Sequence, residues 1–212
     1  MKIALINENS QAAKNQIIYQ ELVNEASKKN HQVFNYGMYS KEDQHQLTYV
    51  KVGLLASILL TSKAVDFVVT GCGTGQGACL ACNSFPNVLC GHIVDSTDAY
   101  LFTQVNAGNC IAMPFAQGFG WGAELNLRYT FEKLFSEDFG NGYPKERAEA
   151  EQANKKILDQ VKEISHRPLI EILKTIDQQF LLETINYPEF KELFFANAQD
   201  NQIKDYLKEI LN

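Results

Sequence analysis

The sequence predicts an α/β fold, with a parallel β-sheet covered by helices on both faces, and three observations predict it. Up to Phe119, short apolar strand patterns alternate with helical patterns. Parallel neighbours need helical crossovers, so repeated strand–helix units indicate a parallel sheet. A glycine-rich loop leads directly from one strand pattern into a helical one. After Phe119 the strand signal ends, and only helical patterns follow.

The first part of the chain contains five strand patterns, separated by helices and polar loops. The expected strands are residues 2–6, 32–36, 66–70, 88–94 and 110–113. Apolar residues at helical spacing predict helices over 16–28, 49–62 and 78–83, and a further helix that starts near residue 95. Residues 7–11 and 40–46 are polar and are expected to form turns or loops.

The remainder of the chain is predicted to be helical. Residues 123–135 are amphipathic, and residues 144–164 form a longer pattern rich in Glu, Lys and Ala. Pro168, Pro188 and Asp200 fit the starts of three further helices. We therefore expect an α/β domain over residues 1–164 and a C-terminal helical extension over residues 165–212. The apolar residues of the extension could pack on the core or on a partner subunit; they include Leu169, Ile172, Leu173, Ile176, Phe180 and Leu181.

Composition excludes several classes of protein. The chain has 212 residues, 45% hydrophobic and 21% charged, which is ordinary for a globular protein. A net charge of −6 argues against a general nucleic-acid binder. No apolar run approaches the ~20 residues of a membrane helix, and the early Glu8 does not fit a signal peptide. The chain has five cysteines, which is an odd number. The simplest interpretation is that they are reduced thiols in a cytoplasmic protein.

The most informative segment is residues 68–77, Val-Val-Thr-Gly-Cys-Gly-Thr-Gly-Gln-Gly. Its glycines allow positive φ and close approach of the backbone. The following helix N-terminus offers free N–H groups and a positive dipole to an anion, and it favours the thiolate form of Cys72. Thr74 adds a hydroxyl donor. The loop is therefore a candidate catalytic site, in which Cys72 moves a proton while fixed donors stabilise an enediolate oxygen.

The loop also has a purely structural interpretation, because a glycine-rich strand-to-helix turn can simply pack tightly and have no chemical role. The Gly-x-Gly-x-Gly spacing is not the dinucleotide-binding fingerprint, and no Lys-Ser/Thr pair follows, so the loop is not a nucleotide P-loop.

Polar residues at strand ends form a second candidate group, because ligands of open α/β sheets bind beyond the carboxyl ends of the strands. Glu8 and Asn9 follow the first strand pattern, and Asp95 and Ser96 follow the fourth. Each of these residues alone is also typical of a turn or a helix cap.

Further polar and cationic candidates lie later in the chain. Asn106 and Asn109 come just before the fifth strand, so reaching the same cleft would need help from the fold or from a second subunit. Arg128, Lys145 and Arg147 could bind a phosphate, although surface solvation is the default for each.

The remaining cysteines and the histidines are expected to be structural. Cys79 and Cys82 form a Cys-x-x-Cys that could bind zinc or run redox chemistry, but no second cysteine pair with suitable spacing exists. Buried thiols that behave as small hydrophobes fit better, and Cys90 and Cys110 in strand patterns are expected to be core as well. The histidines are scattered along the chain: His31, His45, His92 and His166.

Taken together, these residues resemble the ribose-5-phosphate isomerase B and galactose-6-phosphate isomerase family. The resemblance runs from Lys2 to about residue 155 and is strongest over residues 65–77 and 81–83. The family pattern there is a cysteine, then Gly-Thr-Gly, one residue, Gly, and a downstream Ala-Asn. Residues 106–109 match an asparagine-containing region of the family in part, and Arg147 falls where the family has a phosphate-binding arginine.

The resemblance implies a fold and an activity. The implied fold is Rossmann-like, three-layer αβα with a five-stranded parallel sheet, in homodimers or homotetramers whose active sites form between subunits. The implied activity is aldose–ketose isomerisation of a phosphorylated sugar without metal or organic cofactor. Cys72 would move a proton between C2 and C1 through a cis-enediolate, and Thr74 would help to hold the oxyanion. The implied substrate-binding residues are Glu8, Asn9, Gly73, Gly75, Gly77, Asn106 and Arg147.

The sequence departs from the family pattern at three places. Glu8-Asn9 replaces the usual Asp-His after the first strand. Val105 occupies the position of the ring-opening histidine, and the second C-terminal arginine would fall near Tyr143. These departures indicate a divergent branch that acts on another sugar phosphate. The alternatives are a non-catalytic or regulatory sugar-phosphate-binding protein on the same scaffold and, third, a redox protein that uses Cys79 and Cys82.

Overall fold

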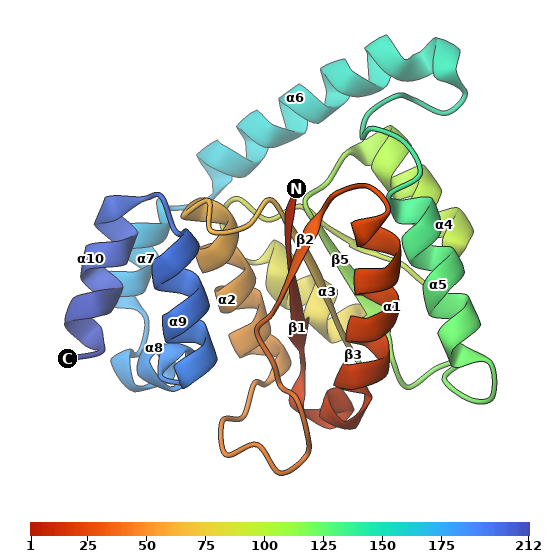
Figure 1. Ribbon diagram of the computed structural model, residues 1–212. Coiled ribbons are helices and arrows are strands. Elements are labelled where there is room, and N and C mark those ends of the chain that lie inside the picture. Colours follow the sequence, from red (N-terminus) through yellow and green to blue (C-terminus); the bar gives the residue numbers. More distant parts are fainter.

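The computed structural model describes residues 1–212, and its centre is a sheet of five parallel strands in the order β2-β1-β3-β5-β4 (Figure 1). The strands are β1 Lys2–Asn7, β2 Gln32–Asn35, β3 Phe67–Cys72, β4 Cys90–His92 and β5 Cys110–Pro114. The predicted α/β class and the five-stranded parallel sheet are confirmed.

The fourth strand is shorter than the pattern over residues 88–94 suggested. Side chains replace the sheet partners at both of its ends. Leu89 donates its N–H to Oδ1 of Asn109 at 2.8 Å, and Val94 donates its N–H to Oδ2 of Asp98 at 3.0 Å. These polar groups are therefore satisfied outside the ladder, so β4 ends early.

Ten α-helices surround the sheet. Those of the first part are α1 Asn15–Ser27, α2 Tyr49–Thr61, α3 Gln76–Asn83, α4 Ser96–Leu101, α5 Ala123–Leu134 and α6 Ala148–Ser165. The C-terminal ones are α7 Leu169–Thr175, α8 Gln178–Ile185, α9 Pro188–Asn197 and α10 Asn201–Ile210. Shorter pieces are the 3-10 helices η1 Asn9–Lys14 and η3 Lys145–Arg147 and the π-helix η2 Phe102–Asn106.

Alternation along β1 separates the two faces of the sheet, because successive side chains point to opposite sides. Ile3 and Leu5 share a core with residues of α1, α4 and α5. Ala4 and Ile6 share the other core with residues of α2. The residues expected to form a polar turn after the first strand instead form η1, whose first turn is capped by the Glu8 carboxylate.

The C-terminal helices continue the second core. Leu173, Leu181 and Phe190 are fully buried in the same cluster as Leu54 and Leu55 of α2. Helix α2 is consequently covered on both sides, by the sheet and by α7–α10, which explains why it is apolar all round. In Figure 1 the blue helices α7–α10 stand beside α2 on the side away from α1. Of the two packing options expected for the extension, the structure shows packing on the core.

Helix α8 was not anticipated from the sequence. The chain leaves the helical conformation at Ile176, where ψ is 156°, and Asp177 then caps a new helix by accepting the N–H of Phe180 at 2.7 Å. The sequence contains neither glycine nor proline at this break, so apolar periodicity alone did not reveal it. Pro188 and Asp200 do start α9 and α10 as expected.

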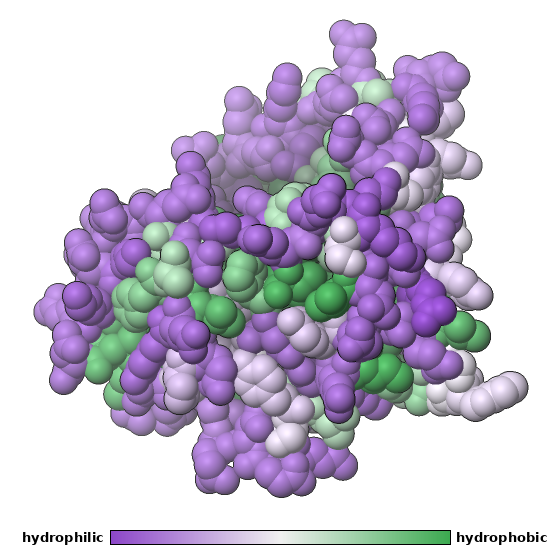
Figure 2. Space-filling view, in the orientation of Figure 1, coloured by the Kyte–Doolittle hydropathy of each residue, from purple (hydrophilic) through white to green (hydrophobic).

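Helix α6 lies apart from the rest of the molecule, across the ends at which the strands begin (Figure 1). On the face shown in Figure 2 it is mostly hydrophilic. It nevertheless exposes four large apolar side chains: Ile157, Leu158, Val161 and Ile164. No helix of the chain combines the length and the apolar character that crossing a membrane requires.

The parallel sheet has two functionally distinct edges. We call the side where the strands end the carboxyl edge and the side where they begin the amino edge. The register pairs Val68 with Cys110 and Cys72 with Pro114. Cys72 therefore lies at the carboxyl edge, while segments that precede β5 lie at the amino edge.

Candidate active site

Cys72 is the last residue of β3, and its side chain points to the start of α3. The residue is 9% exposed. A Cβ placed on Gly77 would lie 3.8 Å from Sγ of Cys72 and 3.5 Å from the ring of Tyr49. Because Gly77 has no side chain, space remains open between this thiol and the aromatic ring. The thiol can thus meet a small molecule directly above the first turn of α3.

Two glycines around Cys72 are required by close packing. A Cβ on Gly71 would lie 2.3 Å from the carbonyl oxygen of Met113, so β3 and β5 could not approach as they do. Gly75 has φ of +74°, and a Cβ there would meet the His92 ring at 2.8 Å. Gly75 is the N-cap of α3 in the left-handed conformation, which turns the chain from strand to helix. These glycines explain the loop's shape, which leaves the N–H groups at the N-terminus of α3 without intrahelical acceptors.

His92 stabilises the same loop. Its Nε2 lies 2.8 Å from the carbonyl oxygen of Thr74. A carbonyl oxygen only accepts hydrogen bonds, so Nε2 carries the proton and the imidazole is the donor. Thr74 itself is exposed, and its Oγ1 lies 3.4 Å from the N–H of Gln76. From the sequence, His92 was expected to be structural, as one of four scattered histidines. In the structure it lies at the end of β4, against the loop.

The segment after β1 lies at the same edge. Glu8 uses its carboxylate as a helix cap, accepting from the N–H of Ser10 at 3.1 Å and from its Oγ at 2.6 Å. Asn9 donates its N–H to the carbonyl oxygen of Leu47 at 2.8 Å and its Nδ2 to Gln46 at 3.4 Å. Glu8 and Asn9 therefore lie at the carboxyl edge as predicted, with local structural bonds of their own.

Gln11 and Lys14 are neighbours of the loop that sequence reasoning missed. Nε2 of Gln11 lies 3.8 Å from the position of a Cβ on Gly73. Nζ of Lys14 donates to Oε1 of Gln11 at 2.8 Å and to the carbonyl oxygen of Phe115, just beyond β5. Partial burial lowers the pKa of the Lys14 ammonium. Gln11 was expected to lie in a turn, and Lys14 lies between that turn and the helix expected from residue 16, so only the fold brings them to β3 and β5.

Asn106 and Arg147 lie at the other edge. Asn106 ends η2, four residues before β5 begins, and it is exposed. Arg147 lies just before α6, has a side chain 67% exposed, and has Nε 3.7 Å from Oε1 of Glu151. β5 alone separates the two edges by about 13 Å at ~3.3 Å per residue. Within one chain these two residues therefore do not meet Cys72.

Several other polar candidates have structural partners. Asp95 caps α4 by accepting the N–H groups of Thr97 and Asp98. Arg128 forms an ion pair with Glu21 at 3.0 Å. Asn109 donates to the carbonyl oxygen of Asn87 at 2.7 Å, in addition to its bond with Leu89. These contacts give each residue a role in the fold.

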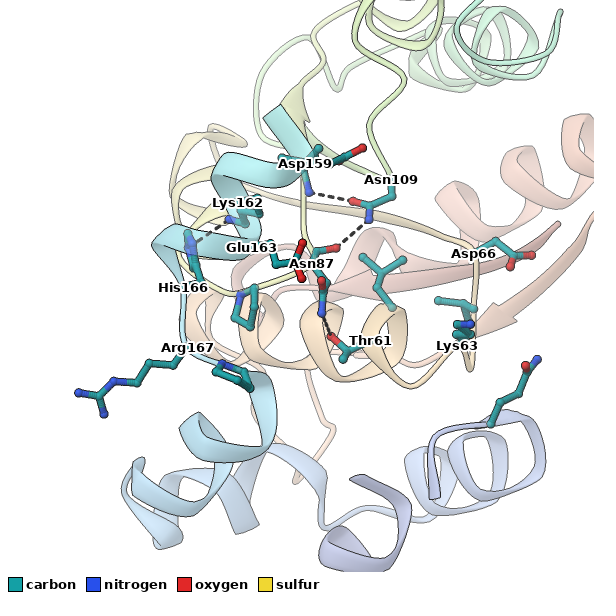
Figure 3. Close-up of a pocket in the computed structure, with 16 residues that line it drawn as sticks. Thr61, Lys63, Asp66, Asn87, Asn109, Asp159, Lys162, Glu163, His166 and Arg167 are labelled. Atoms are coloured by element: carbon teal, nitrogen blue, oxygen red, sulfur yellow. Dashed lines mark hydrogen bonds between the residues drawn. The ribbon is translucent and has the colours of Figure 1, made fainter. Parts of the chain in front are cut away.

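A groove of about 890 Å³ also lies at the amino edge, between α6 and the body of the molecule (Figure 3). Asn87 and Asn109 line one side of it. Another side is lined by Lys162 and Glu163 of α6 and by His166, the residue that follows this helix. The groove is lined by both signs of charge: the cations Lys63, Lys162 and Arg167 and the anions Asp66, Asp159 and Glu163. It is thus distinct from the site around Cys72.

The Cys-x-x-Cys pair does not form a unit of its own. Cys82 is fully buried, whereas Cys79 is half-buried with Sγ 3.5 Å from the carbonyl oxygen of Cys90. Cys82 instead meets Cys90 and Cys110. The sequence placed all of these thiols in the core, and it did not show that three of them converge.

Comparison with known proteins identifies the family. The ribose/galactose isomerase family model matches residues 3–156. A second family model, described as ribose-5-phosphate isomerase, matches residues 164–210. A search of curated proteins gave no match.

Two solved structures resemble the whole chain. A 4-deoxy-L-threo-5-hexosulose-uronate ketol-isomerase complexed with tartrate is 62% identical, with a TM-score of 0.97 over 100% of this chain and 99% of that one. A ribose-5-phosphate isomerase from Vibrio parahaemolyticus is 52% identical, with a TM-score of 0.96 over the same shares.

More distant structures share the fold over part of the chain. A ribose-5-phosphate isomerase B from Clostridium thermocellum is 19% identical, with a TM-score of 0.60 over 78% of this chain and 99% of its own. Both full-length matches are isomerases, and the first family model covers most of the chain. This chain therefore belongs to the ribose/galactose isomerase family and is an aldose–ketose isomerase.

Proposed function

We propose that Cys72 is the base that moves a proton between C2 and C1 of the substrate, through a cis-enediolate. The observation that carries this proposal is the placement of the Cys72 thiol beside the open space at Gly77, above the first turn of α3. The N-terminus of α3 at this end directs free N–H groups and the positive end of a helix dipole toward a bound anion. A base held in contact with the substrate contributes roughly 10²- to 10⁴-fold to the rate.

The loop after Cys72 would stabilise the negative charge that develops on the substrate oxygen. The backbone N–H groups of Gly73 and Gly75 and the hydroxyl of Thr74 are donors on one short loop. The hydrogen bond from His92 to the Thr74 carbonyl oxygen fixes this peptide, and the positive φ of Gly75 makes the turn possible. Donors fixed before the reaction need no reorganisation as charge develops, which makes them effective.

The substrate that best fits this chain's departures from the family pattern is an open-chain uronic acid. The name of the 62% identical relative describes a six-carbon aldehyde with a second carbonyl at C5, no hydroxyl at C4 and a terminal carboxylate. An aldose usually masks its aldehyde as a hemiacetal with the C4 or C5 hydroxyl, and this compound has neither. With such a substrate, Val105 in place of a ring-opening histidine would not lower the activity, because there is no such ring to open.

The charge of the substrate supports the same choice. A carboxylate carries one negative charge, whereas a phosphate monoester carries nearly two at pH 7. Arg147 is present, while the second arginine position is Tyr143. One arginine can bind a carboxylate bidentately. One arginine in place of two thus matches a uronate better than a sugar phosphate.

Arg147 and Asn106 would come from a second copy of the chain. They lie at the amino edge and Cys72 at the carboxyl edge, so one chain does not bring them to one small substrate. The exposed apolar residues of α6, including Ile164 at 82%, offer a surface for a second copy. We therefore propose a homodimer, or a homotetramer built from it, with active sites between subunits, working in the cytoplasm.

The second candidate substrate is a phosphorylated sugar of the ribose-5-phosphate or galactose-6-phosphate type. The 52% identical relative is a ribose-5-phosphate isomerase, and Arg147 occupies the position of a phosphate-binding arginine. A non-catalytic sugar-phosphate-binding protein would bind such a ligand without turnover, which the full-length identity to isomerases disfavours.

To test this proposal, the purified enzyme is incubated in heavy water with each of three substrates: 4-deoxy-L-threo-5-hexosulose uronate, ribose 5-phosphate and galactose 6-phosphate. Proton NMR follows both ketose formation and deuterium incorporation at the carbon beside the carbonyl. We expect turnover and exchange with the uronate, and far slower turnover with both phosphates. Turnover of a phosphate alone would replace the uronate with the second candidate, and no exchange with any of the three would remove the isomerase mechanism.

A further inference from the structure

Three cysteines that lie far apart in the sequence meet in one place. Cys82 comes from α3, Cys90 is the first residue of β4 and Cys110 is the first residue of β5. Their Sγ atoms all lie within 4.8 Å of one another. Cys90 and Cys110 are direct register partners on adjacent strands, and Cys82 approaches them from the helix above. We call these residues the thiol triad.

The triad is largely shielded from bulk water, and its thiols influence one another. Cys82 and Cys110 are 0% exposed, and Cys90 is half-buried. Hydrogen bonds from Cys110 and Cys90, helped by the nearby Lys162 ammonium, lower the pKa of the Cys82 thiol. Burial and the hydrogen bond with Cys82 raise the pKa of the Cys110 thiol. The three sulfur atoms are thus a compact set of soft ligand atoms, held largely out of bulk water.

The triad lies next to the groove at the amino edge. Leu89 and Asn109 line that groove, and each immediately precedes a triad cysteine in the chain. Lys162 also lines the groove and donates its Nζ to the carbonyl oxygen of Asn83, next to Cys82. In Figure 3, Asn109 and Lys162 lie on neighbouring walls of this space. A small ion entering the groove therefore has a short path to the sulfurs.

We propose that the thiol triad binds one thiophilic d¹⁰ cation, Zn²⁺ or Cu⁺, through the three Sγ atoms. Thiolate ligands select such ions over hard cations. With metal–sulfur bonds of ~2.3 Å, three ligands of one ion are separated by about 4 Å. The sulfurs need to close by less than about 1 Å, which small side-chain rotations achieve. Each thiol that binds as a thiolate releases one proton to solvent, and no electron is transferred.

The ion would be structural and would not take part in isomerisation. It would lie at the amino edge, whereas Cys72 lies at the carboxyl end of β3. It would connect α3, β4 and β5, the elements around the catalytic loop, directly through their side chains. Because it binds the native arrangement only, loading should raise the thermal midpoint of the protein.

The test titrates the reduced full-length protein separately with Zn²⁺ and with Cu⁺, against a chromophoric chelator, and counts bound metal by mass spectrometry. We expect one ion per chain and a higher melting temperature. Cys90→Ser should weaken binding by roughly 100-fold or more, because one of three ligands is lost. The matched control is Cys72→Ser, which removes the thiol at the opposite edge and should bind metal as the wild type does. The relative affinity of the two arms identifies the preferred ion.

X-ray absorption spectroscopy of the metal-loaded wild type identifies the ligand atoms directly, so the test does not depend on the folding of a variant. At least three sulfur neighbours at about 2.3 Å are expected. A shell dominated by nitrogen or oxygen, binding that survives Cys90→Ser unchanged, or no tight binding of either ion would show that the triad is only a set of packed core thiols.

Discussion

The two edges of the sheet differ in what they contribute. The carboxyl edge holds a compact group built around Cys72, in which glycines, His92 and Gln11 define the loop. The amino edge holds Asn106, Arg147 and the large groove, with α6 lying across it. The Cys72 thiol thus lies at one end of the strands, and Asn106 and Arg147 lie at the other. Under the proposed function, one chain carries two halves of a site, and a second copy would join them.

The largest effect is expected at the carboxyl edge. Cys72→Ser replaces the proton-transfer thiol with a hydroxyl that is far harder to ionise, so kcat should fall by roughly 10³-fold or more. Steady-state kinetics with the accepted substrate measures this. Cys79→Ser, which changes a half-buried thiol on α3, is the matched control and should keep most of the activity. A Cys72→Ser enzyme with nearly full kcat would assign the base to another residue.

The next effect tests whether the amino edge needs a second copy. Ile164→Lys places a charge on the exposed apolar surface of α6, where Ile164 is 82% exposed in the single chain. A charge buried in an apolar interface is strongly unfavourable, so the dimer should dissociate and activity should fall in parallel. Sedimentation and activity are measured over the same concentration range. Leu125→Lys on α5, also exposed, is the control, and an active monomeric Ile164→Lys protein would contradict the split site.

Arg147 should affect binding more than chemistry. Its charge-assisted hydrogen bonds contribute about 1.5–3 kcal/mol, so Arg147→Ala should raise KM by roughly 10- to 100-fold and change kcat much less. Arg167→Ala, another exposed cation at the amino edge, should leave KM unchanged. Equal KM values for the two variants would remove Arg147 from the site.

The smallest effect concerns the positioning of the loop. His92→Phe removes the hydrogen bond to the Thr74 carbonyl while keeping an aromatic ring beside Gly75. A lost hydrogen bond of about 1 kcal/mol should lower kcat by roughly five- to tenfold and leave KM little changed. His92→Gln, which can still donate, should recover most of the loss. Identical kcat values for the two variants would mean that the bond does not organise the loop.

Local patterns predicted much of this structure and the loop at its centre. Alternating strand and helix patterns predicted the five strands, and the glycine spacing located Cys72 at a strand end. The break before α8 lacked a glycine or proline signal, since it depends on the packing of α7 and α8 against α2. Sequence periodicity describes one element at a time and does not contain such contacts.

The candidate site shows the same limit. Gln11 and Lys14 reach the loop only because β1 is the neighbour of β3 in the sheet. The thiol triad was hidden because its members come from three elements, and two of them meet through strand register. Spacing along the chain identifies a ligand set only when the ligands are close in sequence.

The most direct test of the split site is complementation between two inactive variants. Cys72→Ser lacks the thiol, and the Asn106→Ala/Arg147→Ala double variant lacks the groups of the opposite edge. When the two are co-expressed with different tags, half of the dimers are mixed, and each mixed dimer has one intact site, so about a quarter of wild-type activity should return. Activity of the purified mixed dimer well above that of either parent is the predicted result. A mixed dimer as inactive as its parents would contradict the account.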